Sequence, residues 1–309
     1  MSLHIETPLI ESDPLSEAAG CQVWLKLDAL QPTGSFKIRG IGMACESYAR
    51  HGKRRFISSS GGNAGIAVAY AGRRLSVPVV VVVPETTTER ARSLIRQQGA
   101  QLIVHGGAWH DANALAQSML GEDDAFVHPF DDPLIWRGHA SLVDEVAHAG
   151  IKPDAVVLSV GGGGLFCGVV EGLHHNGWHD VPVITAETTG ADALALSLAA
   201  GERIELDSIT SIATSLGAKQ VCEQAFALTK QHPVRPAVVS DLAALQACER
   251  FLEDHRILVE PACGASLALA YDQSGTLKGF DSVLVVVCGG VTASVDQLRQ
   301  WRAATVSED

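Results

Sequence analysis

Residues 155–165 read Ala155-Val-Val-Leu-Ser-Val-Gly-Gly-Gly-Gly-Leu165, an apolar run that passes directly into four glycines. The run has no polar alternation, which is typical of a strand buried on both faces of a parallel sheet. We expect a helix to begin at Leu165. A glycine-rich turn between a strand and a helix lets backbone N–H groups converge on an anion at the positive helix end. Gly161 to Gly164 therefore indicate a phosphate site, with close packing of the helix on the strand as the alternative explanation.

Similar apolar runs and helical patterns alternate along the rest of the chain. The other β-branched runs are Val79–Val83, Val183–Ala186 and Ser282–Cys288. Helices are expected at Thr86–Gln98, Asp111–Met119 and Asp241–Glu253, because capping residues stand near their ends. Alternating strands and helices of this kind predict an α/β fold.

Composition limits the classes of partner. The chain has 309 residues, is 47% hydrophobic and 19% charged, and carries a net charge of −12. The length favours about two domains of roughly 150 residues each. The negative charge argues against binding to nucleic acid or to an anionic membrane surface, since both require clustered positive charge. The seven cysteines are dispersed, with no Cys-x-x-Cys pair. They indicate reduced thiols and, with no signal peptide or membrane-spanning run in the sequence, a cytoplasmic protein.

Three other glycine-containing segments carry residues capable of chemistry: Gln31–Gly40, Ser58–Gly65 and Val287–Val291. A lone lysine is usually a surface charge, but the neighbours of Lys37 are small or apolar. Partial desolvation lowers the pKa of a lysine, so Lys37 is a candidate for forming a Schiff base.

The segment around Ser60 precedes an expected helix from Ile66 to Arg73, where successive N–H groups could hold a carboxylate. Asn63 adds an amide donor, although an ordinary helix cap is the alternative. Cys288 would place a thiol at the carboxyl edge of the sheet, where open α/β folds bind ligands, or it would be an inert small hydrophobe. Together the four segments offer the parts needed to hold pyridoxal 5′-phosphate and an amino acid.

The motifs Pro32-Thr-Gly-Ser-Phe-Lys37, Ser60-Gly-Gly-Asn63, the four glycines and Cys288-Gly-Gly resemble those of pyridoxal-phosphate enzymes of the tryptophan-synthase-β type (fold type II). Within that class the chain is similar to the serine dehydratase (L-serine ammonia-lyase) and serine-dehydratase-like group. The resemblance implies two open, twisted, mostly parallel sheets flanked by helices, with the cofactor in the cleft between two domains. The large domain would comprise residues 1–41 and 137–309, the small one residues 42–136, and the enzyme would be a homodimer.

The resemblance also implies roles for individual residues. Lys37 would bind the cofactor covalently and act in catalysis, Phe36 would pack against the pyridine ring, and Asn63 would bond the 3′ oxygen. Cys288 would face the pyridine nitrogen as a neutral thiol, which makes the ring a weaker electron sink and favours prompt β-elimination. The backbone of Gly161, Gly162, Gly163, Gly164 and Leu165 would hold the phosphate.

Substrate and cation sites follow from the same resemblance. Ser60 would hold the substrate carboxylate together with Gly61, Gly62 and Asn63. Ser60 is also expected to be a catalytic residue. Gly61 stands where the mammalian-type dehydratases have alanine, and the role of Ser215 near the cofactor stays open. A potassium ion would be held by Glu187, Ala191, Gly161 and Leu216.

The implied reaction is β-elimination of L-serine to pyruvate and ammonia, with L-threonine giving 2-oxobutyrate. Threonine deaminase and serine racemase share the fold and are alternatives, as is a catalytically silent metabolite-binding protein. A nucleotide-dependent oxidoreductase is a weaker alternative. It stays open because a glycine-rich turn followed by an acidic residue at the end of the next strand, here Glu187, also occurs in dinucleotide-binding folds. His174, His175 and His179 are expected to be surface histidines rather than metal ligands.

Overall fold

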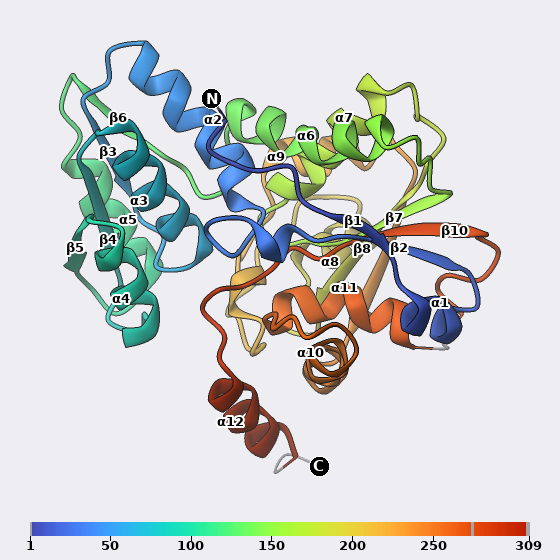
Figure 1. Ribbon diagram of the computed structural model, residues 1–309. Coiled ribbons are helices and arrows are strands. Elements are labelled where there is room, and N and C mark those ends of the chain that lie inside the picture. Colours follow the sequence, from blue (N-terminus) through green and yellow to red (C-terminus); the bar gives the residue numbers. More distant parts are fainter. Residues whose placement is uncertain (1, 273–274, 307–309) are drawn as a thin grey trace.

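The computed structural model describes residues 2–272 and 275–306 and contains two sheets flanked by helices. Figure 1 shows the smaller sheet on one side of the molecule and the larger sheet on the other. The expected α/β fold with two mostly parallel sheets is confirmed.

The large sheet has the strand order β1-β2-β10-β7-β8-β9 and is parallel except for the β1–β2 pair. Its strands are β1 (Leu9–Glu11), β2 (Gln22–Lys26), β7 (Ala155–Ser159), β8 (Val183–Thr188), β9 (Val234–Val239) and β10 (Ser282–Val286). The chain lays β7, β8 and β9 outward and then returns to insert β10 between β2 and β7. The loops after β7 and β10 therefore diverge at a topological switch point, where open α/β sheets bind ligands. These loops carry the four glycines and Cys288.

The small sheet has the order β5-β4-β3-β6 and is entirely parallel. Its strands are β3 (Arg55–Ser58), β4 (Val79–Val83), β5 (Gln101–Val104) and β6 (Asp124–Phe126). The chain runs outward through β4 and β5 and returns to β6 on the other side of β3. A second switch point thus lies between the loop after β3, which contains Ser60, and the loop after β6.

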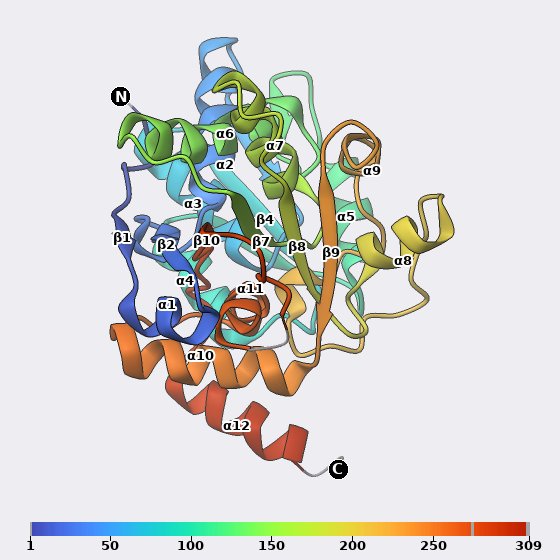
Figure 2. The same cartoon turned by 90° about the vertical axis from the view of Figure 1, so that its right-hand side faces the viewer.

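Helices cover the faces of the sheets. Figures 1 and 2 place α6 and α7 on one face of the large sheet and α10 and α11 on the other, with α12 packed outside α10. The helices are α1 (Asp13–Ala19), α2 (Lys37–Arg50), α3 (Asn63–Leu75), α4 (Glu89–Gln97), α5 (Trp109–Ser118), α6 (Pro133–His148), α7 (Gly164–His175), α8 (Ala193–Ala200), α9 (Glu223–Leu228), α10 (Asp241–His255), α11 (Pro261–Tyr271) and α12 (Val295–Val306), with short 3-10 turns η1 (Asp28–Leu30) and η2 (Thr214–Leu216).

Most of the expected elements appear with small changes at their ends. The run from Ser282 ends as a strand at Val286, so Cys288 lies two residues beyond it. Helix α4 begins at Glu89, because Thr88 caps it by accepting from the N–H of Ala91. Helix α3 begins at Asn63 rather than at Ile66, with Gly62 as its N-cap.

The two sheets have separate apolar cores, and α2 belongs to the core of the small sheet through Ile38, Ile41 and Ala44. The domain boundaries that we predicted at residues 42 and 136 fall inside α2 and α6. Each of these helices would therefore be shared between the two predicted domains, and the division itself stays a prediction.

A buried network of charges fixes the start of α2. The Arg39 guanidinium donates to Asp28 (Nε to Oδ2, 2.7 Å) and to Glu145 (Nη1 to Oε1, 2.5 Å), and the Lys26 ammonium lies 2.5 Å from Glu145. The side chains of Arg39 and Asp28 are fully buried. Because Arg39 lies two residues after Lys37, the network ties the first turn of α2 to the large sheet.

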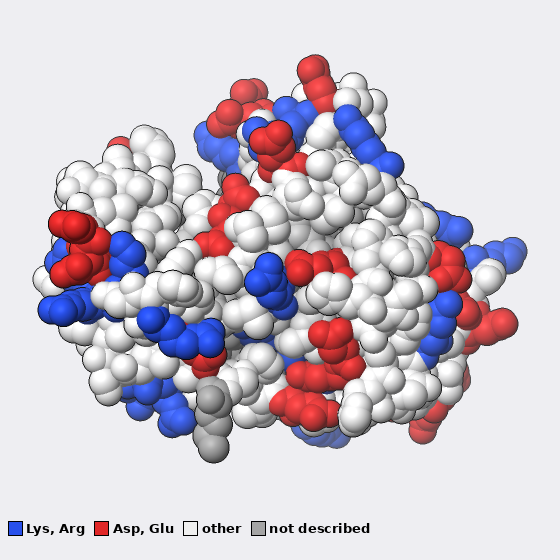
Figure 3. All heavy atoms as spheres, turned by 90° about the horizontal axis from the view of Figure 1, so that it is seen from above, with Lys and Arg blue, Asp and Glu red and all other residues white. Residues whose placement is uncertain are grey.

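Charge on the outside is mixed. Figure 3 shows Lys and Arg scattered among Asp and Glu on the face that it draws, with no continuous basic patch there. Among the helices that the structure describes, none combines the length and apolar character that crossing a bilayer requires.

Candidate active site

The loop before α2 is joined to the loop after β10 by backbone contacts. Phe36 N–H donates to the Cys288 carbonyl (3.0 Å), Gly290 N–H donates to the Gly34 carbonyl (2.9 Å), and Ser35 pairs with Gly289 in an isolated bridge. This pairing brings the segments of Lys37 and Cys288 together at the carboxyl edge of the large sheet.

Lys37 is the first residue of α2 and is partly buried. Its Nζ donates to the Pro129 carbonyl oxygen, in the loop after β6, at 2.8 Å. Burial lowers the pKa of the Lys37 amine to about 8, against the opposing influence of Cys288 and Glu260. A substantial share of the amine is therefore neutral near pH 8, as a nucleophile or a general base requires.

The segment after β3 forms a tight turn into α3. A Cβ on Gly65 would lie 1.8 Å from the carbonyl oxygen of Ser60, so a residue with a side chain there would displace this loop. A Cβ on Gly61 would lie 2.5 Å from Oγ1 of Thr87, a neighbour that sequence reasoning did not identify. Helix α3 has no side-chain cap, and its first N–H groups face this turn as they do in anion sites.

Asn63 is buried and lies against Glu260 at the start of α11. Its Nδ2 donates to Oε1 of Glu260 at 2.8 Å, whereas its Oδ1 is buried with no partner among the described residues. The Thr292 hydroxyl donates to Oε2 of Glu260 at 2.9 Å, and Ser215 acts to lower the pKa of the same carboxyl group. The structure thus gives Ser215 a contact that the sequence left open.

The four glycines at the junction of β7 and α7, the last of which is the first residue of α7, are required by close packing. A Cβ on Gly162 would lie 2.4 Å from the ring of Phe130, and one on Gly164 would lie 2.6 Å from its carbonyl oxygen. Gly163 has φ +93°, in the left-handed region that favours glycine, and caps α7 without a side-chain hydrogen bond. Packing and phosphate binding are therefore compatible explanations, since the same loop leaves the helix end uncapped.

Cys288 and Phe36 lie beside unpredicted partners. A hydrogen bond with Cys263, together with burial, raises the pKa of the Cys288 thiol, so this thiol is neutral. The Phe36 ring lies 4.9 Å from the ring of His139 between centroids. His139 is fully buried and its pKa is lowered by burial, so a neutral imidazole packs against Phe36, and neither of its ring nitrogens has a hydrogen-bond partner among the described residues.

Glu187, at the end of β8, is fully buried. Its oxygens accept from the N–H groups of Leu194 (2.9 Å) and Ala195 (2.7 Å) at the start of α8. Burial raises the pKa of Glu187 to about 7. The position of a Cβ on Gly161 is 3.2 Å from the Leu216 carbonyl oxygen. Ala191 is buried just before α8, and its N–H donates to the Thr188 carbonyl.

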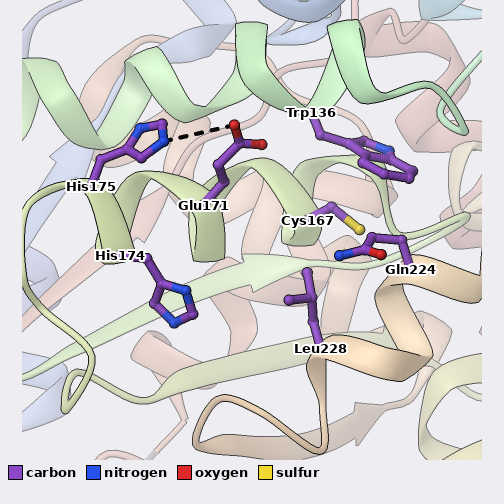
Figure 4. A pocket seen from close by; sticks show the side chains of 7 residues that line it. All are labelled: Trp136, Cys167, Glu171, His174, His175, Gln224 and Leu228. Atoms are coloured by element: carbon purple, nitrogen blue, oxygen red, sulfur yellow. Dashed lines mark ion pairs between the residues drawn. The ribbon is translucent and has the colours of Figure 1, made fainter.

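A separate cavity of about 280 Å³ lies between α6, α7 and α9 (Figure 4). It is lined by Trp136, Cys167, Glu171, His174, His175, Gln224 and Leu228, none of which is a predicted site residue. His175 and His179 are exposed, and His174 is partly buried against His232 (3.2 Å between Nε2 and Nδ1). Within residues 2–272 and 275–306, no cluster of His, Cys, Asp and Glu could hold a metal ion.

Sequence reasoning missed Glu260, Thr292, Thr87 and Phe130 as parts of this site. The sequence signal for Glu260 was weak, because an acidic residue before a proline is also an ordinary helix start, as Glu260 and Pro261 are here.

The residues present fit pyridoxal phosphate. Gly162 and Gly164 form a loop whose Cβ positions are filled, α7 offers an uncapped N-terminus, Asn63 Oδ1 is a buried polar atom without a partner, and Lys37 supplies the amine.

Comparison with known proteins gives the same result. A model of the family described as "Pyridoxal-phosphate dependent enzyme" matches residues 1–289. A human L-serine dehydratase/L-threonine deaminase is 47% identical over 96% of this chain and 94% of its own length. A mouse serine dehydratase-like protein is 47% identical over 97% of this chain and 94% of its own. The crystal structure of a fungal L-serine ammonia-lyase from Rhizomucor miehei superposes with a TM-score of 0.92 at 38% identity, covering 98% of this chain and 99% of that chain. The expected resemblance is confirmed: this chain belongs to the family of pyridoxal-phosphate-dependent enzymes.

Proposed function

We propose that this protein is an L-serine dehydratase, which eliminates water from L-serine to give aminoacrylate, whose hydrolysis releases pyruvate and ammonia. By the same route it would convert L-threonine to 2-oxobutyrate as a second activity. The observation that carries the proposal is the partly buried Lys37 amine, which donates to the Pro129 carbonyl and whose pKa burial lowers to about 8. The names of the human relative and of the fungal ammonia-lyase support the substrate and the reaction.

The cofactor supplies the electron sink on which the elimination depends. Backbone N–H groups from Gly161 to Leu165 would hold its phosphate, and Phe36, Asn63 and Cys288 would contact its ring. Lys37 would be its point of covalent attachment. The freed Nζ of Lys37 would then remove the proton from the substrate Cα.

The substrate carboxylate would bind in the turn of Ser60, Gly61 and Gly62, at the uncapped start of α3. A carboxylate fixed there would orient the amino acid toward Lys37, whose Nζ donates to the Pro129 carbonyl in the loop after β6. We also propose that the enzyme is a cytoplasmic homodimer.

Replacing Cys288 by Asp should change the outcome of the reaction. An acidic partner would keep the pyridine nitrogen protonated and strengthen the electron sink, which a neutral thiol does not. The Cys288→Asp enzyme should form D-serine or the transamination product in addition to pyruvate, measured by chiral chromatography. An unchanged product ratio in a folded, cofactor-loaded variant would refute this role for the thiol.

We also propose that a potassium ion binds at a site formed by Glu187, Ala191, Gly161 and Leu216. The raised pKa of Glu187 means that its protonation favours the folded state. The contribution of this protonation to the stability of the folded state is fully present below about pH 4.5 and is lost as the pH rises toward about 7. A bound cation would compensate the ionised carboxylate, so it would stabilise the protein mainly at high pH.

The melting temperature should therefore rise more with potassium chloride, relative to tetramethylammonium chloride, at pH 8 than at pH 5.5. In a Glu187→Gln variant the difference between the two pH values should disappear. An equal potassium effect at both pH values would argue against cation binding at this carboxylate.

Initial rates of 2-oxo acid formation from L-serine, L-threonine and D-serine test the assignment against its relatives of the same fold. We expect the highest kcat/KM with L-serine, a lower value with L-threonine and little with D-serine. A strong preference for L-threonine would favour a threonine deaminase, accumulation of D-serine a serine racemase, and binding without turnover a silent homologue.

A further inference from the structure

Glu260 lies where four separate segments of the site meet. Its side chain is 95% buried, with a relative exposure of 5%. Asn63, from the start of α3, donates to Oε1 at 2.8 Å, and Thr292, from the loop after β10, donates to Oε2 at 2.9 Å. Ser215, from η2, also acts on this carboxyl group and favours its ionised form. No role was assigned to Glu260 from the sequence.

All of these partners act as donors toward the carboxyl group. The amide nitrogen of Asn63 can only donate, and a carboxylate can only accept. Burial leaves the pKa of Glu260 raised overall. The Asn63 amide and the Thr292 hydroxyl nonetheless each donate to one of its two carboxyl oxygens, and Lys37 lies near enough to act against the raised pKa. The surroundings of Glu260 therefore supply the hydrogen-bond donors that a buried carboxylate requires.

The loop after β10 is built around this side chain. Gly290 has φ +130°, and a Cβ there would lie 2.2 Å from Cγ of Glu260. The N–H of Glu260 also donates to the Gly289 carbonyl at 3.4 Å. Glu260 thus connects the loop of Cys288 on the large sheet with the first residue of α3 on the small sheet.

The hydrogen bond with Glu260 also determines which of its two orientations the side-chain amide of Asn63 adopts. With Nδ2 held by Glu260, Oδ1 is left buried without a protein partner among the described residues. Turning the amide over would place Oδ1 against the carboxylate, where two acceptors repel each other and both lose a hydrogen bond. The orientation of this amide is therefore a property of the pair and not of Asn63 alone.

We propose that Glu260 is a positioning residue, which acts through Asn63 by fixing the polarity of the amide that this site offers to the ring of the cofactor. This role of Glu260 rests on the proposed contact of Asn63 with the cofactor, but it does not depend on which amino acid is the substrate. A glutamine at position 260 keeps the volume but can donate as well as accept, so it releases the amide to turn.

A double-mutant cycle on the affinity for pyridoxal phosphate tests this. The dissociation constant and the absorbance spectrum of the bound cofactor are measured for the wild-type protein, Glu260→Gln, Asn63→Ala and the double variant. We expect Glu260→Gln to raise the dissociation constant about tenfold, as loss of a hydrogen bond to a charged group would, and to change the spectrum. In the Asn63→Ala background the same change should have an effect of less than about twofold, since residues that act through one another are not additive.

Thr292→Val is the matched control, because it removes a donor from the same carboxylate and leaves the Asn63 contact intact. It should change the spectrum less than Glu260→Gln does. If Glu260→Gln does not fold, the cycle is run with Glu260→Asp, which keeps the charge but withdraws it from Asn63.

Additive effects in the cycle, or a Glu260→Gln protein that matches the wild type in both measurements, would overturn the proposal. A non-additive cycle in a protein that forms no pyruvate from L-serine would contradict the proposed function and leave the role of Glu260 supported.

Discussion

Lys37→Ala should lower the rate of pyruvate formation from L-serine by at least about 10³-fold, because it removes both the covalent attachment of the cofactor and the general base. Lys26 is also buried, but its ammonium is ion-paired with Glu145 and hydrogen-bonded to the Thr7 carbonyl. Because these partners hold the Lys26 ammonium, we do not expect it to take over the cofactor attachment or the proton transfer from Lys37.

Borohydride reduction followed by peptide mass analysis provides the second measurement. The wild-type protein should carry a reduced pyridoxyl group on Lys37, and the variant should carry none. Lys152→Ala is the control, because this exposed lysine pairs with Asp180 at the surface and should keep both the activity and the adduct. A stable adduct on another lysine of the Lys37→Ala protein would show that the assignment is wrong.

Arg39→Met should lower the free energy of unfolding by about 3–5 kcal/mol, the usual consequence of removing one partner from a buried ion pair. Asp28 is fully buried and would keep only the Thr7 hydroxyl (2.8 Å) among the partners found for its side chain within the described residues. Glu145 would keep Lys26. Urea denaturation of the two proteins gives the difference.

Arg55→Met is the matched control. Arg55 makes a similarly close pair with Asp124, but its side chain is 37% exposed, so the loss should be below about 1 kcal/mol. If Arg39→Met cost no more than Arg55→Met, the buried network could not be what fixes the start of α2.

The sequence predicted the strands that have unbroken apolar runs, such as Val79–Val83 and Ala155–Ser159, because both faces of these strands are covered by helices. It did not reveal β9, which lies at the edge of the large sheet, is half exposed and contains Pro236. An edge strand tolerates proline and exposure and so lacks the buried pattern. The three-residue strands β1 and β6 are too short to produce any periodicity.

The site was predictable where its residues are close together in the sequence. The glycines from Gly161 to Gly164 and the turn of Ser60 to Asn63 are local motifs, whose backbone chemistry can be inferred from spacing alone. The contact of Asn63 with Glu260 spans 197 residues, and that of Arg39 with Glu145 spans 106. Such pairs depend on the order of the strands and on the close approach of two sheets, which no local pattern contains.

The product inventory of a single reaction tests the central claim most directly. The cofactor-loaded protein is incubated with L-serine until the substrate is consumed, and pyruvate, ammonia and D-serine are quantified together. β-Elimination predicts pyruvate and ammonia in equal amounts, each equal to the serine consumed, with no accumulation of D-serine. Serine that is consumed without pyruvate, or that is recovered as its D enantiomer, would contradict the account.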